Sequence, residues 1–341
     1  MRSKVLVTGS DGYIGTMLCA KLQEKFDVTG LDAGYYRNDY LYTPLWNMPA
    51  VITKDIRQVT AADLEGFDAV ICLSDLNDPL SQAYPEITKK TNYEGPARFA
   101  ILCKEVGIKK FIYSSSASVY GFAADSIMDE ASELNPLTPY AECKVKMEEH
   151  LLSLCDDSFS VACLRNSTVY GLSPRIRFDL VINYLCGTAI AKNTIELKSD
   201  GGAWRPFVHI NDVCDAFVSI LELPPTNTSG LVVNVGNGET GNYRVIDIAG
   251  MIRDLTGCKI TVNNSNKDKR SYRISSSKLE GLGLECRRDL KAEISAMLDF
   301  FKRIKLTEDD LSSNTFTRLE QIRYLLATKQ IDQDLYWSRD E

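Results

Sequence analysis

Short apolar runs alternate with amphipathic stretches through the first half of the chain. The apolar runs predict buried strands at residues 5–7, 28–32, 50–56, 67–73, 110–116 and 160–165. Apolar positions at helical spacing predict helices from residue 16, over 93–106 and over 139–152. This alternation favours an α/β fold with a parallel, doubly wound sheet. Residues 33–49 are aromatic and polar with two prolines, so we expect a loop or a short helix there.

The regular alternation is lost after residue 165. Apolar runs at residues 207–210 and 231–235 predict further strands, and residues 245–255 predict a helix. We expect residues 166–305 to form mainly a smaller second lobe, with segments near 205–240 returning to the first domain. Residues 306–341 are expected to be a helical tail. One face of that tail carries an apolar stripe of the kind that usually packs onto its own domain, formed by Phe316, Leu319, Ile322 and Leu326.

A glycine-rich turn follows the first strand. Gly9, Gly12 and Gly15 let the chain reverse tightly and let backbone N–H groups approach a phosphate, and the next helix points its positive end there. Asp32 ends the second strand, where a carboxylate accepts hydrogen bonds from both ribose hydroxyls of NAD and repels the 2′-phosphate of NADP. Residues 1–165 are therefore predicted to bind NAD. The alternative is an ordinary βαβ unit with a surface aspartate.

Composition narrows the classes of partner and compartment. The 341 residues carry a formal charge of −7, which disfavours nucleic acid or an anionic membrane as the main partner. Ten cysteines without a C-x-x-C pair indicate reduced thiols, and no apolar stretch has the length of a signal-peptide core or a membrane span, so we expect a cytoplasmic protein. Two histidines make a histidine-rich metal site or a Ser-His-Asp hydrolase unexpected.

Candidate acid–base chemistry lies at Tyr140 and Lys144. Residues four apart on a helix project from the same face, and a nearby lysine lowers the pKa of a tyrosine towards the range useful for a base. The pair alone is weak evidence, because a chain of this composition contains about one such spacing by chance. Ser116 strengthens it, because this residue ends the fifth strand, and ligands bind beyond the carboxyl ends of the strands in a doubly wound sheet.

Several motifs occur together and in order along most of the chain: Thr8-Gly-Ser-Asp-Gly-Tyr-Ile-Gly15, Asp32, Asp55-Ile56, Ser114-Ser-Ser-Ala-Ser-Val-Tyr-Gly121, Tyr140-x-x-x-Lys144 and Arg205-Pro-Phe-Val-His-Ile-Asn-Asp212. With them the sequence resembles an extended short-chain dehydrogenase/reductase of the nucleotide-sugar epimerase/dehydratase family. The resemblance implies a nucleotide-diphosphate sugar as substrate. It also implies a homodimer joined by a four-helix contact of the helices around Phe99 and Leu151.

The same resemblance implies roles for individual residues. Tyr140 would be the base, Lys144 would hold the nicotinamide ribose, and Ser116 would hydrogen-bond the reacting sugar oxygen. Asp55 and Ile56 would hold the adenine, and Arg205 would contact the nucleotide diphosphate. The full set of expected cofactor-binding residues is Gly9, Gly12, Tyr13, Ile14, Gly15, Asp32, Asp55, Ile56, Leu73, Asn92, Ser114, Tyr140 and Lys144.

The residues after Ser116 bear on the reaction. The family's 4,6-dehydratases carry acidic residues there, where this chain has Ala117 and Ser118, so dehydration is disfavoured. The run is similar to that of 4-epimerases, and we favour an NAD-dependent C4 epimerase that oxidises its sugar transiently. A reductase of nucleotide-linked 4-keto sugars is the alternative, although such enzymes often use NADPH and Asp32 argues against that cofactor. A dinucleotide-sensing scaffold is a non-enzymatic alternative, which usually loses the tyrosine or the lysine.

Three positions depart from the family pattern. Thr168 stands where many relatives have a phosphate-binding asparagine, and a hydroxyl still donates one hydrogen bond. Asp75 replaces a small apolar residue after the fourth strand; it contacts a sugar hydroxyl or amino group, or else it is a helix-capping or solvated acid. Arg270 reaches the diphosphate, or else lies in a solvated basic turn.

Other polar residues have simpler interpretations. Arg175 and Arg177 stand beside the expected diphosphate region, and the spacing does not decide between them, although Arg177 is taken as the candidate ligand. His209 is interpreted as a structural hydrogen-bonding residue. Asp212 is expected to cap the helix that follows it. No metal site is predicted.

Overall fold

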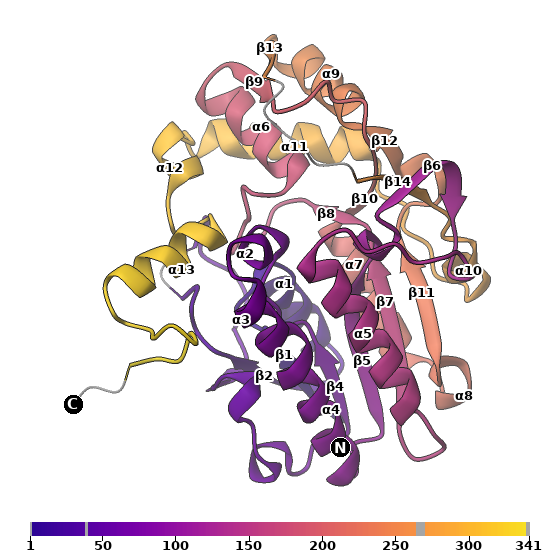
Figure 1. The fold of residues 1–341 in the computed structure, drawn as a ribbon. Coiled ribbons are helices and arrows are strands. Elements are labelled where there is room, and N and C mark those ends of the chain that lie inside the picture. The colour runs from indigo at the N-terminus through magenta and orange to yellow at the C-terminus, as the bar shows by residue number, and fades with distance from the viewer. Residues whose placement is uncertain (1, 38–39, 264–269, 339–341) are drawn as a thin grey trace.

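The computed structural model describes residues 2–37, 40–263 and 270–338, and a parallel sheet of seven strands runs through its centre (Figure 1). The strand order is β11-β7-β5-β4-β1-β2-β3, so the chain winds outward from β1 in both directions. The strands are β1 (Lys4–Thr8), β2 (Asp27–Asp32), β3 (Ala50–Thr53), β4 (Ala69–Cys72), β5 (Lys110–Ser116), β7 (Ser160–Asn166) and β11 (Leu231–Val235). The predicted doubly wound parallel sheet is confirmed.

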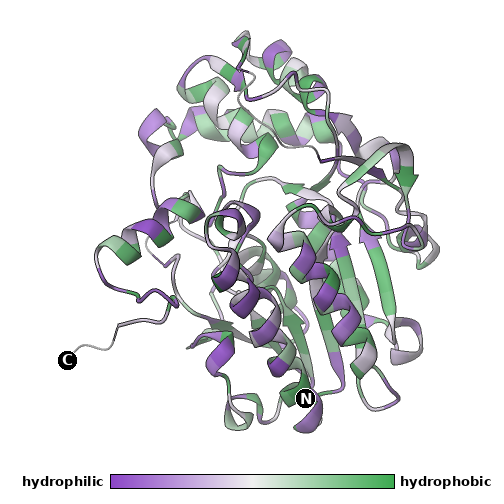
Figure 2. Cartoon of the chain, viewed as in Figure 1, coloured by the Kyte–Doolittle hydropathy of each residue, from purple (hydrophilic) through white to green (hydrophobic). Residues whose placement is uncertain are grey.

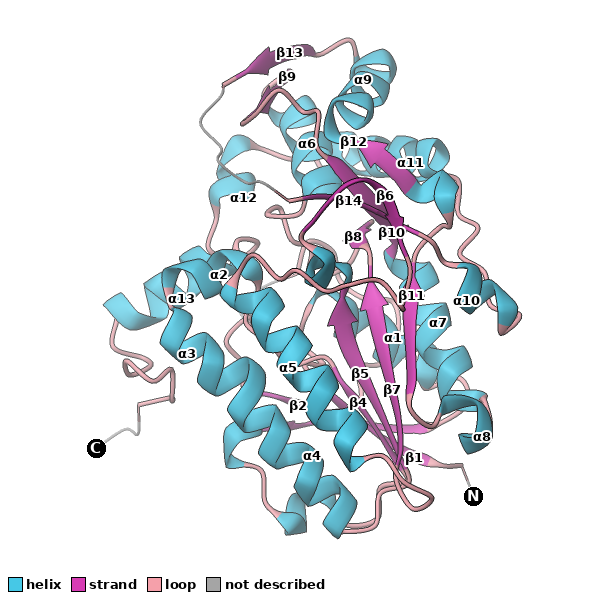
Figure 3. Ribbon diagram, turned by 45° about the vertical axis from the view of Figure 1, so that its right-hand side comes forward, coloured by secondary structure: helices cyan, strands magenta, loops and turns pink. Residues whose placement is uncertain are grey.

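Helices cover both faces of this sheet (Figure 3). One face packs against α1 (Tyr13–Leu22) and α7 (Ile210–Glu222), and the other packs against α4 (Gly95–Glu105) and α5 (Pro139–Leu154). Successive residues of a strand point to opposite faces, so Val5 and Val7 enter the first core while Leu6 enters the second. Because both faces are buried, the central strands are mainly apolar along their middle, green in Figure 2, and polar residues stand at their ends.

A smaller lobe lies beyond the carboxyl ends of the strands and is built mainly from residues after 166 (Figure 1). Its longer helices pack together, α6 (Val181–Ala191) against both α9 (Val245–Thr256) and α11 (Leu290–Arg303). Its strands form one three-stranded and two two-stranded sheets. They are β6 (Phe122–Met128), β8 (Thr168–Tyr170), β9 (Thr194–Leu197), β10 (Trp204–His209), β12 (Asn242–Arg244), β13 (Lys259–Val262) and β14 (Ser271–Ile274).

Short helices connect the remaining elements. They are α2 (Asp78–Ala83), α3 (Pro85–Lys89), α8 (Pro225–Thr228), α10 (Ser277–Gly281), α12 (Glu308–Ser312) and α13 (Arg318–Ala327). Single turns are η1 (Ile56–Gln58), η2 (Ala61–Leu64), the π-turn η3 (Lys90–Glu94), η4 (Ala117–Tyr120) and η5 (Glu239–Gly241). Within the described part of the chain, none of these helices combines the length and apolarity that a membrane crossing needs.

Most predicted elements are present, with shifted ends. The first helix begins at Tyr13 rather than at residue 16, and the helix expected over 93–106 is the π-turn η3 followed by α4. The run at 231–235 joins the main sheet as β11, whereas the run at 207–210 is part of β10 and pairs with β8 and β12. The described residues of the 33–49 stretch, which exclude 38 and 39, contain no helix or strand.

The interpretation of Asp212 as a helix cap is wrong. His209 occupies the cap position of α7, where its Nδ1 accepts a hydrogen bond of 3.2 Å from the backbone N–H of Asn211. Asp212 lies in the first turn instead and accepts a hydrogen bond of 3.3 Å from the backbone N–H of Arg288. His209 is buried, so its predicted structural role agrees with its position.

Candidate active site

A cavity of about 770 Å³ lies at the carboxyl ends of the central strands, between the sheet and the smaller lobe. The predicted site residues that line it are Gly9, Gly12, Tyr13, Ile14, Gly15, Asp32, Asp55, Ile56, Leu73, Asp75, Ser114, Ser116, Tyr140, Thr168, Arg177, Arg205 and Arg270. Segments more than 300 residues apart in the sequence meet here, because Arg318 and Leu319 of α13 lie in the same wall. Among the predicted residues, Asn92 and Lys144 do not line the cavity.

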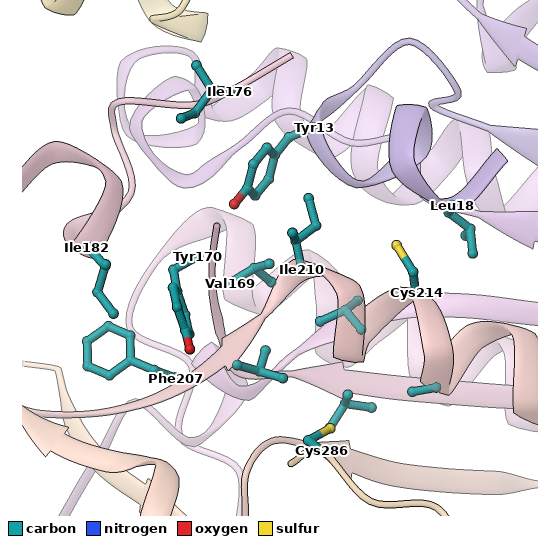
Figure 4. Close-up of a cluster of buried hydrophobic side chains, with 14 of the residues drawn as sticks. Tyr13, Leu18, Val169, Tyr170, Ile176, Ile182, Phe207, Ile210, Cys214 and Cys286 are labelled. Carbon is teal, nitrogen blue, oxygen red and sulfur yellow. The ribbon is translucent and has the colours of Figure 1, made fainter. Parts of the chain in front are cut away.

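The glycine turn has no room for larger residues. Gly9 has φ of +72°, and a Cβ on Gly15 would lie 2.1 Å from the Gly9 carbonyl oxygen, so the tight reversal requires glycine at both positions. Tyr13 opens α1, and its hydroxyl donates a 2.8 Å hydrogen bond to the Gly171 carbonyl oxygen. Figure 4 shows its ring near Tyr170 in one buried cluster. The hydrogen bond of Tyr13 to Gly171 thus ties the start of α1, next to the turn, to the second lobe.

Asp32 lies at the end of β2 beside this turn. Its carboxylate accepts hydrogen bonds from the backbone N–H groups of Gly34, at 2.8 Å, and Asp11, at 3.1 Å. Burial raises the pKa of Asp32 to about 6, and the neighbouring Asp11 carboxylate adds to that rise. A carboxylate has about four acceptor positions, and these two donors leave some of them for hydroxyl groups, as the prediction of ribose binding requires.

Asp55 also lines the cavity, but protein donors already engage its carboxylate. Arg57 forms a double hydrogen bond with it, Nε to Oδ1 at 2.9 Å and Nη2 to Oδ2 at 2.7 Å. The Arg57 backbone N–H adds a third hydrogen bond, at 2.8 Å. The Tyr35 hydroxyl lies 3.2 Å from Oδ2, but its single proton is shared with the Leu335 carbonyl oxygen, which is nearer at 2.5 Å. A carboxylate has about four acceptor positions, so adenine would take the one that Tyr35 fills only in part. The contact of Asp55 with adenine stays a prediction, as does that of Ile56.

Ser116, Tyr140 and the Lys144 ammonium group come together beside the turn. Ser116 ends β5, where its Oγ accepts a 3.2 Å hydrogen bond from the Ser118 backbone N–H. Tyr140 lies in the first turn of α5, which begins after the Thr138 cap with Pro139 at its first position. Lys144 lies one turn further along the same helix face, with Nζ 5.3 Å from the centre of the Tyr140 ring.

Lys144 is buried beneath the cavity and has protein partners. Its Nζ donates a hydrogen bond to the Ser114 carbonyl oxygen and forms an ion pair of 2.8 Å with Asp75. It also lies 4.6 Å from the centre of the Tyr113 ring. Asn77 caps α2, so Asp75 is not a helix cap. Its ion pair with the buried Lys144 shows that it is not simply a solvated acid. The predicted contact of Lys144 with the nicotinamide ribose would compete with these partners.

These neighbours set the pKa of the tyrosine. Burial raises the pKa of Tyr140 above its usual value, and the charge of Asp75 raises it further, while Lys144 and Arg177 lower it. The expected influence of the lysine has the predicted direction, but burial and Asp75 outweigh it. Burial also lowers the pKa of Lys144, yet Asp75 and two tyrosines more than compensate, so the amine remains protonated.

A buried ionic network holds α5 against the sheet beneath these groups. Glu148 of α5 accepts hydrogen bonds from Arg165 of β7, Nη2 to Oε2 at 2.7 Å and Nε to Oε1 at 3.0 Å, and from the Ser115 hydroxyl. Arg165 also donates to the Tyr120 hydroxyl at 3.0 Å. This network fixes the helix that carries Tyr140, and no sequence motif indicated it.

Arginines and acids alternate along another part of the cavity wall. Arg177 donates from Nε, at 3.0 Å, and Nη2, at 2.9 Å, to Asp179, and Arg270 forms an ion pair of 2.6 Å with Asp78. Arg205 of β10 and Thr168 of β8 lie in the same wall. Arg270 is thus not in a solvated turn. This part of the cavity wall offers guanidinium donors suited to a diphosphate.

A family model matches residues 5–236, which is more than half of the chain, and its description is the NAD dependent epimerase/dehydratase family. The chain belongs to this family. The family's NAD is therefore the cofactor, and the predicted recognition, enzyme class and cofactor are confirmed. The cramped glycine turn and the buried Asp32 carboxylate fit a dinucleotide, because the turn lets backbone N–H groups approach a phosphate and the carboxylate, with two backbone donors, can accept further hydrogen bonds from a ribose.

Relatives within this epimerase/dehydratase family are distant. A Bacillus subtilis protein named "Uncharacterized UDP-glucose epimerase YtcB" is 28% identical over 286 residues, covering 77% of this chain and 85% of the relative. The UDP-glucose 4-epimerase of the same organism is 27% identical over 295 residues, covering 75% and 83%. More distant relatives include a human dTDP-D-glucose 4,6-dehydratase, 24% identical over 324 residues, covering 88% and 90%.

Solved structures of family members superpose over nearly their full length. MoeE5 in complex with UDP-glucuronic acid and NAD has a TM-score of 0.75 and 26% identity, covering 88% of this chain and 99% of that one. UDP-glucuronic acid 4-epimerase from Bacillus cereus, in complex with UDP-glucuronic acid and NAD, has a TM-score of 0.74 and 25% identity over the same shares. The fold and the cofactor are common to these proteins.

Two features of this family member differ from the sequence-based expectation. Asn92 lies behind the cavity wall, where its Oδ1 accepts from the Leu76 backbone N–H and its Nδ2 donates to the Leu76 carbonyl oxygen, each at 2.8 Å. It orders the segment after β4, and a direct cofactor contact stays a prediction. Asp78 and Asp179 were not predicted. A signal existed for the first, since Asn77-Asp78-Pro79 after a strand is a helix start facing the crevice.

Proposed function

We propose that the protein is an NAD-dependent epimerase that inverts a carbinol carbon, C4 in the favoured case, of a nucleotide-diphosphate sugar. The observation that carries the proposal is the position of Tyr140 and Ser116 in one cavity with the glycine turn, with Lys144 directly beneath. A base, a hydroxyl donor and a dinucleotide turn in one place are suited to moving a hydride and a proton together.

Each residue has a part in this reaction. The Ser116 hydroxyl hydrogen-bonds the reacting sugar oxygen, and Tyr140 takes the hydroxyl proton. NAD held by the glycine turn and Asp32 would supply the acceptor, and then the donor, of the hydride at the same carbon. The keto-sugar turns over between the two transfers and receives the hydride on its other face. Tyr140 then gives the proton back, so the sugar leaves as the epimer and the enzyme ends unchanged.

The arginine residues of the cavity wall support a diphosphate-linked substrate. Arg177, Arg205 and Arg270 line it together with the Thr168 hydroxyl, which supplies several donors for phosphate oxygens. The relatives named for UDP-glucose and UDP-glucuronic acid make UDP-sugars the first candidates. Asp75 reaches both Lys144 and the cavity, so we propose that it also meets a sugar hydroxyl or amino group.

The assembly and compartment follow the family resemblance. We propose a homodimer through α4 and α5, whose outer faces expose Ile101, 39% accessible, and Leu152, 37% accessible, although such side chains are usually covered. Ten free cysteines, nine of them buried, support a reducing compartment such as the cytoplasm. Light scattering of the purified protein tests the dimer directly.

A substrate panel tests the proposal. Purified protein would be incubated with UDP-, dTDP-, GDP- and CDP-sugars, and products would be separated by chromatography and identified by NMR. We expect two epimers to reach equilibrium without added NADH. Consumption of NADH in proportion to product would support the ketoreductase alternative and overturn the epimerase. No turnover of any sugar by a protein with bound NAD would favour the scaffold alternative.

A further inference from the structure

Residues 317–338, here called segment 317–338, lie against the cofactor half of the molecule although they follow the second lobe in the sequence (Figure 1). The segment consists of α13 and a loop whose residues Ile331 and Trp337 pair as an isolated bridge. Leu335 is 1% exposed and packs in a cluster with Tyr35 and Leu80. These contacts hold the segment against the edge of the cavity that Asp32 and Asp55 line.

The contacts of the loop fall on residues that form the crevice around Asp32 and Asp55. The Trp337 Nε1 donates a 2.6 Å hydrogen bond to the Ala33 carbonyl oxygen, next to Asp32. The Tyr35 hydroxyl donates to the Leu335 carbonyl oxygen at 2.5 Å. Ala33 and Tyr35 line the cavity, so the loop stands directly behind its wall.

Arg57 extends this fastening to the side where Asp55 lies. Its Nη1 donates a 2.8 Å hydrogen bond to the Asp334 carbonyl oxygen, and its guanidinium carbon lies 4.1 Å from the centre of the Tyr336 ring. The Asp334 carboxylate adds an exposed ion pair of 2.7 Å with Lys90. The same arginine holds the Asp55 carboxylate, so the loop and the predicted adenine site share one residue.

Arg318 enters the cavity itself from the start of α13. It is 4% exposed and lines the crevice, with its guanidinium 4.3 Å from the centre of the Tyr36 ring and Nη2 donating at 3.0 Å to the Arg175 carbonyl oxygen. Among the described residues, no carboxylate lies within ion-pair distance of it. Burial lowers the pKa of Arg318 to about 10. A buried guanidinium that lines a cavity and is hydrogen-bonded only to carbonyl oxygens keeps its positive charge and part of its donors for an anion.

We propose that segment 317–338 is part of the NAD site: Arg318 binds the cofactor's pyrophosphate, and the loop closes the adenosine end, so that bound NAD exchanges slowly. The pyrophosphate of NAD is favoured over the diphosphate of the sugar nucleotide because Arg318 stacks on Tyr36, four residues after Asp32. Arg205 and Arg270 are the residues proposed above for the diphosphate of the sugar nucleotide. The inference depends on NAD binding and not on which sugar reacts.

Slow exchange has a functional meaning. An enzyme that oxidises and reduces its substrate within one cycle regenerates its NAD and gains nothing by releasing it. A reductase must release the oxidised cofactor after every turnover. A closed adenosine end is therefore suited to the first type of cycle and would limit the rate of the second.

The test compares cofactor release from three full-length variants. Trp337→Ala removes an exposed side chain of the loop, Arg318→Met removes the charge, and Tyr324→Ala is a matched control that removes an exposed aromatic side chain of α13 without a crevice contact. Bound NADH would be displaced by excess NAD and followed by its fluorescence. We expect Trp337→Ala to release NADH about fivefold to tenfold faster, and Arg318→Met to weaken NADH binding about tenfold or more. Tyr324→Ala should match the wild type.

Two further measurements keep the outcomes distinct. UDP binding, measured by calorimetry, should be unchanged in Arg318→Met, and weaker UDP binding with normal NADH binding would overturn the assignment of Arg318. Thermal unfolding identifies a variant that fails to fold. If Arg318→Met does not fold, the test depends on Trp337→Ala. The Trp337 side chain is 43% exposed, so its removal should not prevent folding. Release of NADH from a folded Trp337→Ala at the wild-type rate would refute the closing role of the loop.

Discussion

The ion pair between Asp75 and Lys144 makes a quantitative prediction for the pH dependence of catalysis. Asp75 Oδ2 is 2.8 Å from Lys144 Nζ, which is 5.3 Å from the centre of the Tyr140 ring, so the carboxylate lies within about 8 Å of the ring. Two charges at that distance interact by ~2 kcal/mol at an effective dielectric constant of about 20. That energy corresponds to roughly 1.5 pKa units. Asp75 is 22% exposed, and solvent screening should reduce the effect to about one unit.

The sign follows from the charge. A negative Asp75 opposes ionisation of Tyr140 and raises its pKa, so Asp75→Asn should lower that pKa. Since the reaction needs the phenolate, the rising limb of the pH profile of kcat should move about one pH unit towards lower pH. The amide keeps the size of the side chain, so folding should be little affected. KM would rise separately if Asp75 also binds the sugar.

The assay is the initial rate of epimerisation at saturating substrate from pH 6 to pH 10, with the wild type, Asp75→Asn and Asp215→Asn. This range lies below the raised pKa of Tyr140, where the phenolate fraction rises with pH, so a pKa lower by one unit should make Asp75→Asn about tenfold faster than the wild type at each pH. Asp215 is a matched control, because it pairs with Lys21 on the outer faces of α7 and α1, away from the cavity. Asp215→Asn should keep the wild-type profile. An equal or lower rate in Asp75→Asn across this range would refute the electrostatic argument.

Three other predictions concern single residues. Tyr140→Phe should lower kcat by about a thousandfold or more while bound NAD per protein stays unchanged, as nucleotide analysis after denaturation would show, and near-normal kcat would exclude Tyr140 as the base. Burial raises the pKa of Asp32 to about 6, and ribose hydroxyls stabilise the ionised form, so NAD affinity should fall about tenfold per pH unit below pH 6. Calorimetry from pH 5 to 8 tests this, and Asp32→Asn should abolish the slope. Burial lowers the pKa of His209 to about 4, against about 6.5 in the unfolded chain. Between these two pH values the unfolded chain binds a proton that the folded protein does not. The free energy of unfolding should therefore fall by up to ~3 kcal/mol as the pH drops from 6.5 to 4. Urea unfolding should show a weaker loss in His209→Asn, which keeps an acceptor at the cap, and an equal loss would contradict the assignment.

The sequence was sufficient for features that depend on local pattern. A strand buried on both faces carries a run of consecutive apolar residues, so β1, β4, β5 and β7 could be predicted from such runs in the sequence. The glycine turn could be predicted because its backbone geometry permits no other residue. Topology then brings the ends of parallel strands to one edge, and this rule was enough to place Ser116 beside the turn.

Features that depend on long-range partners were not predictable. Nothing local to Lys144 shows that Asp75, 69 residues earlier, occupies one of its donors. The Asp55 motif could not reveal that Arg57 and Tyr35 already engage its carboxylate. The cap of α7 is His209 and not Asp212, because the helix begins at Ile210, three residues before the start at Val213 that a cap at Asp212 predicts.

The tail is an intermediate case. Its apolar stripe correctly indicated packing on its own chain, and Ile322 is indeed buried in a cluster with Tyr35 and Leu76. The stripe could not indicate which surface it covers, because many apolar surfaces of similar size exist in a chain of this length. The position of Arg318 in the cofactor crevice follows only from the three-dimensional arrangement.

The central claim is that one carbon of the sugar gives its hydride to NAD and receives the same hydride back within a single cavity. Epimerisation in D2O, followed by NMR at the inverted carbon, tests this most directly. The account predicts that both epimers form without deuterium at that carbon and without net formation of NADH, and that Tyr140→Phe stops the exchange. Deuterium at the inverted carbon, or loss of water from the sugar, would contradict it.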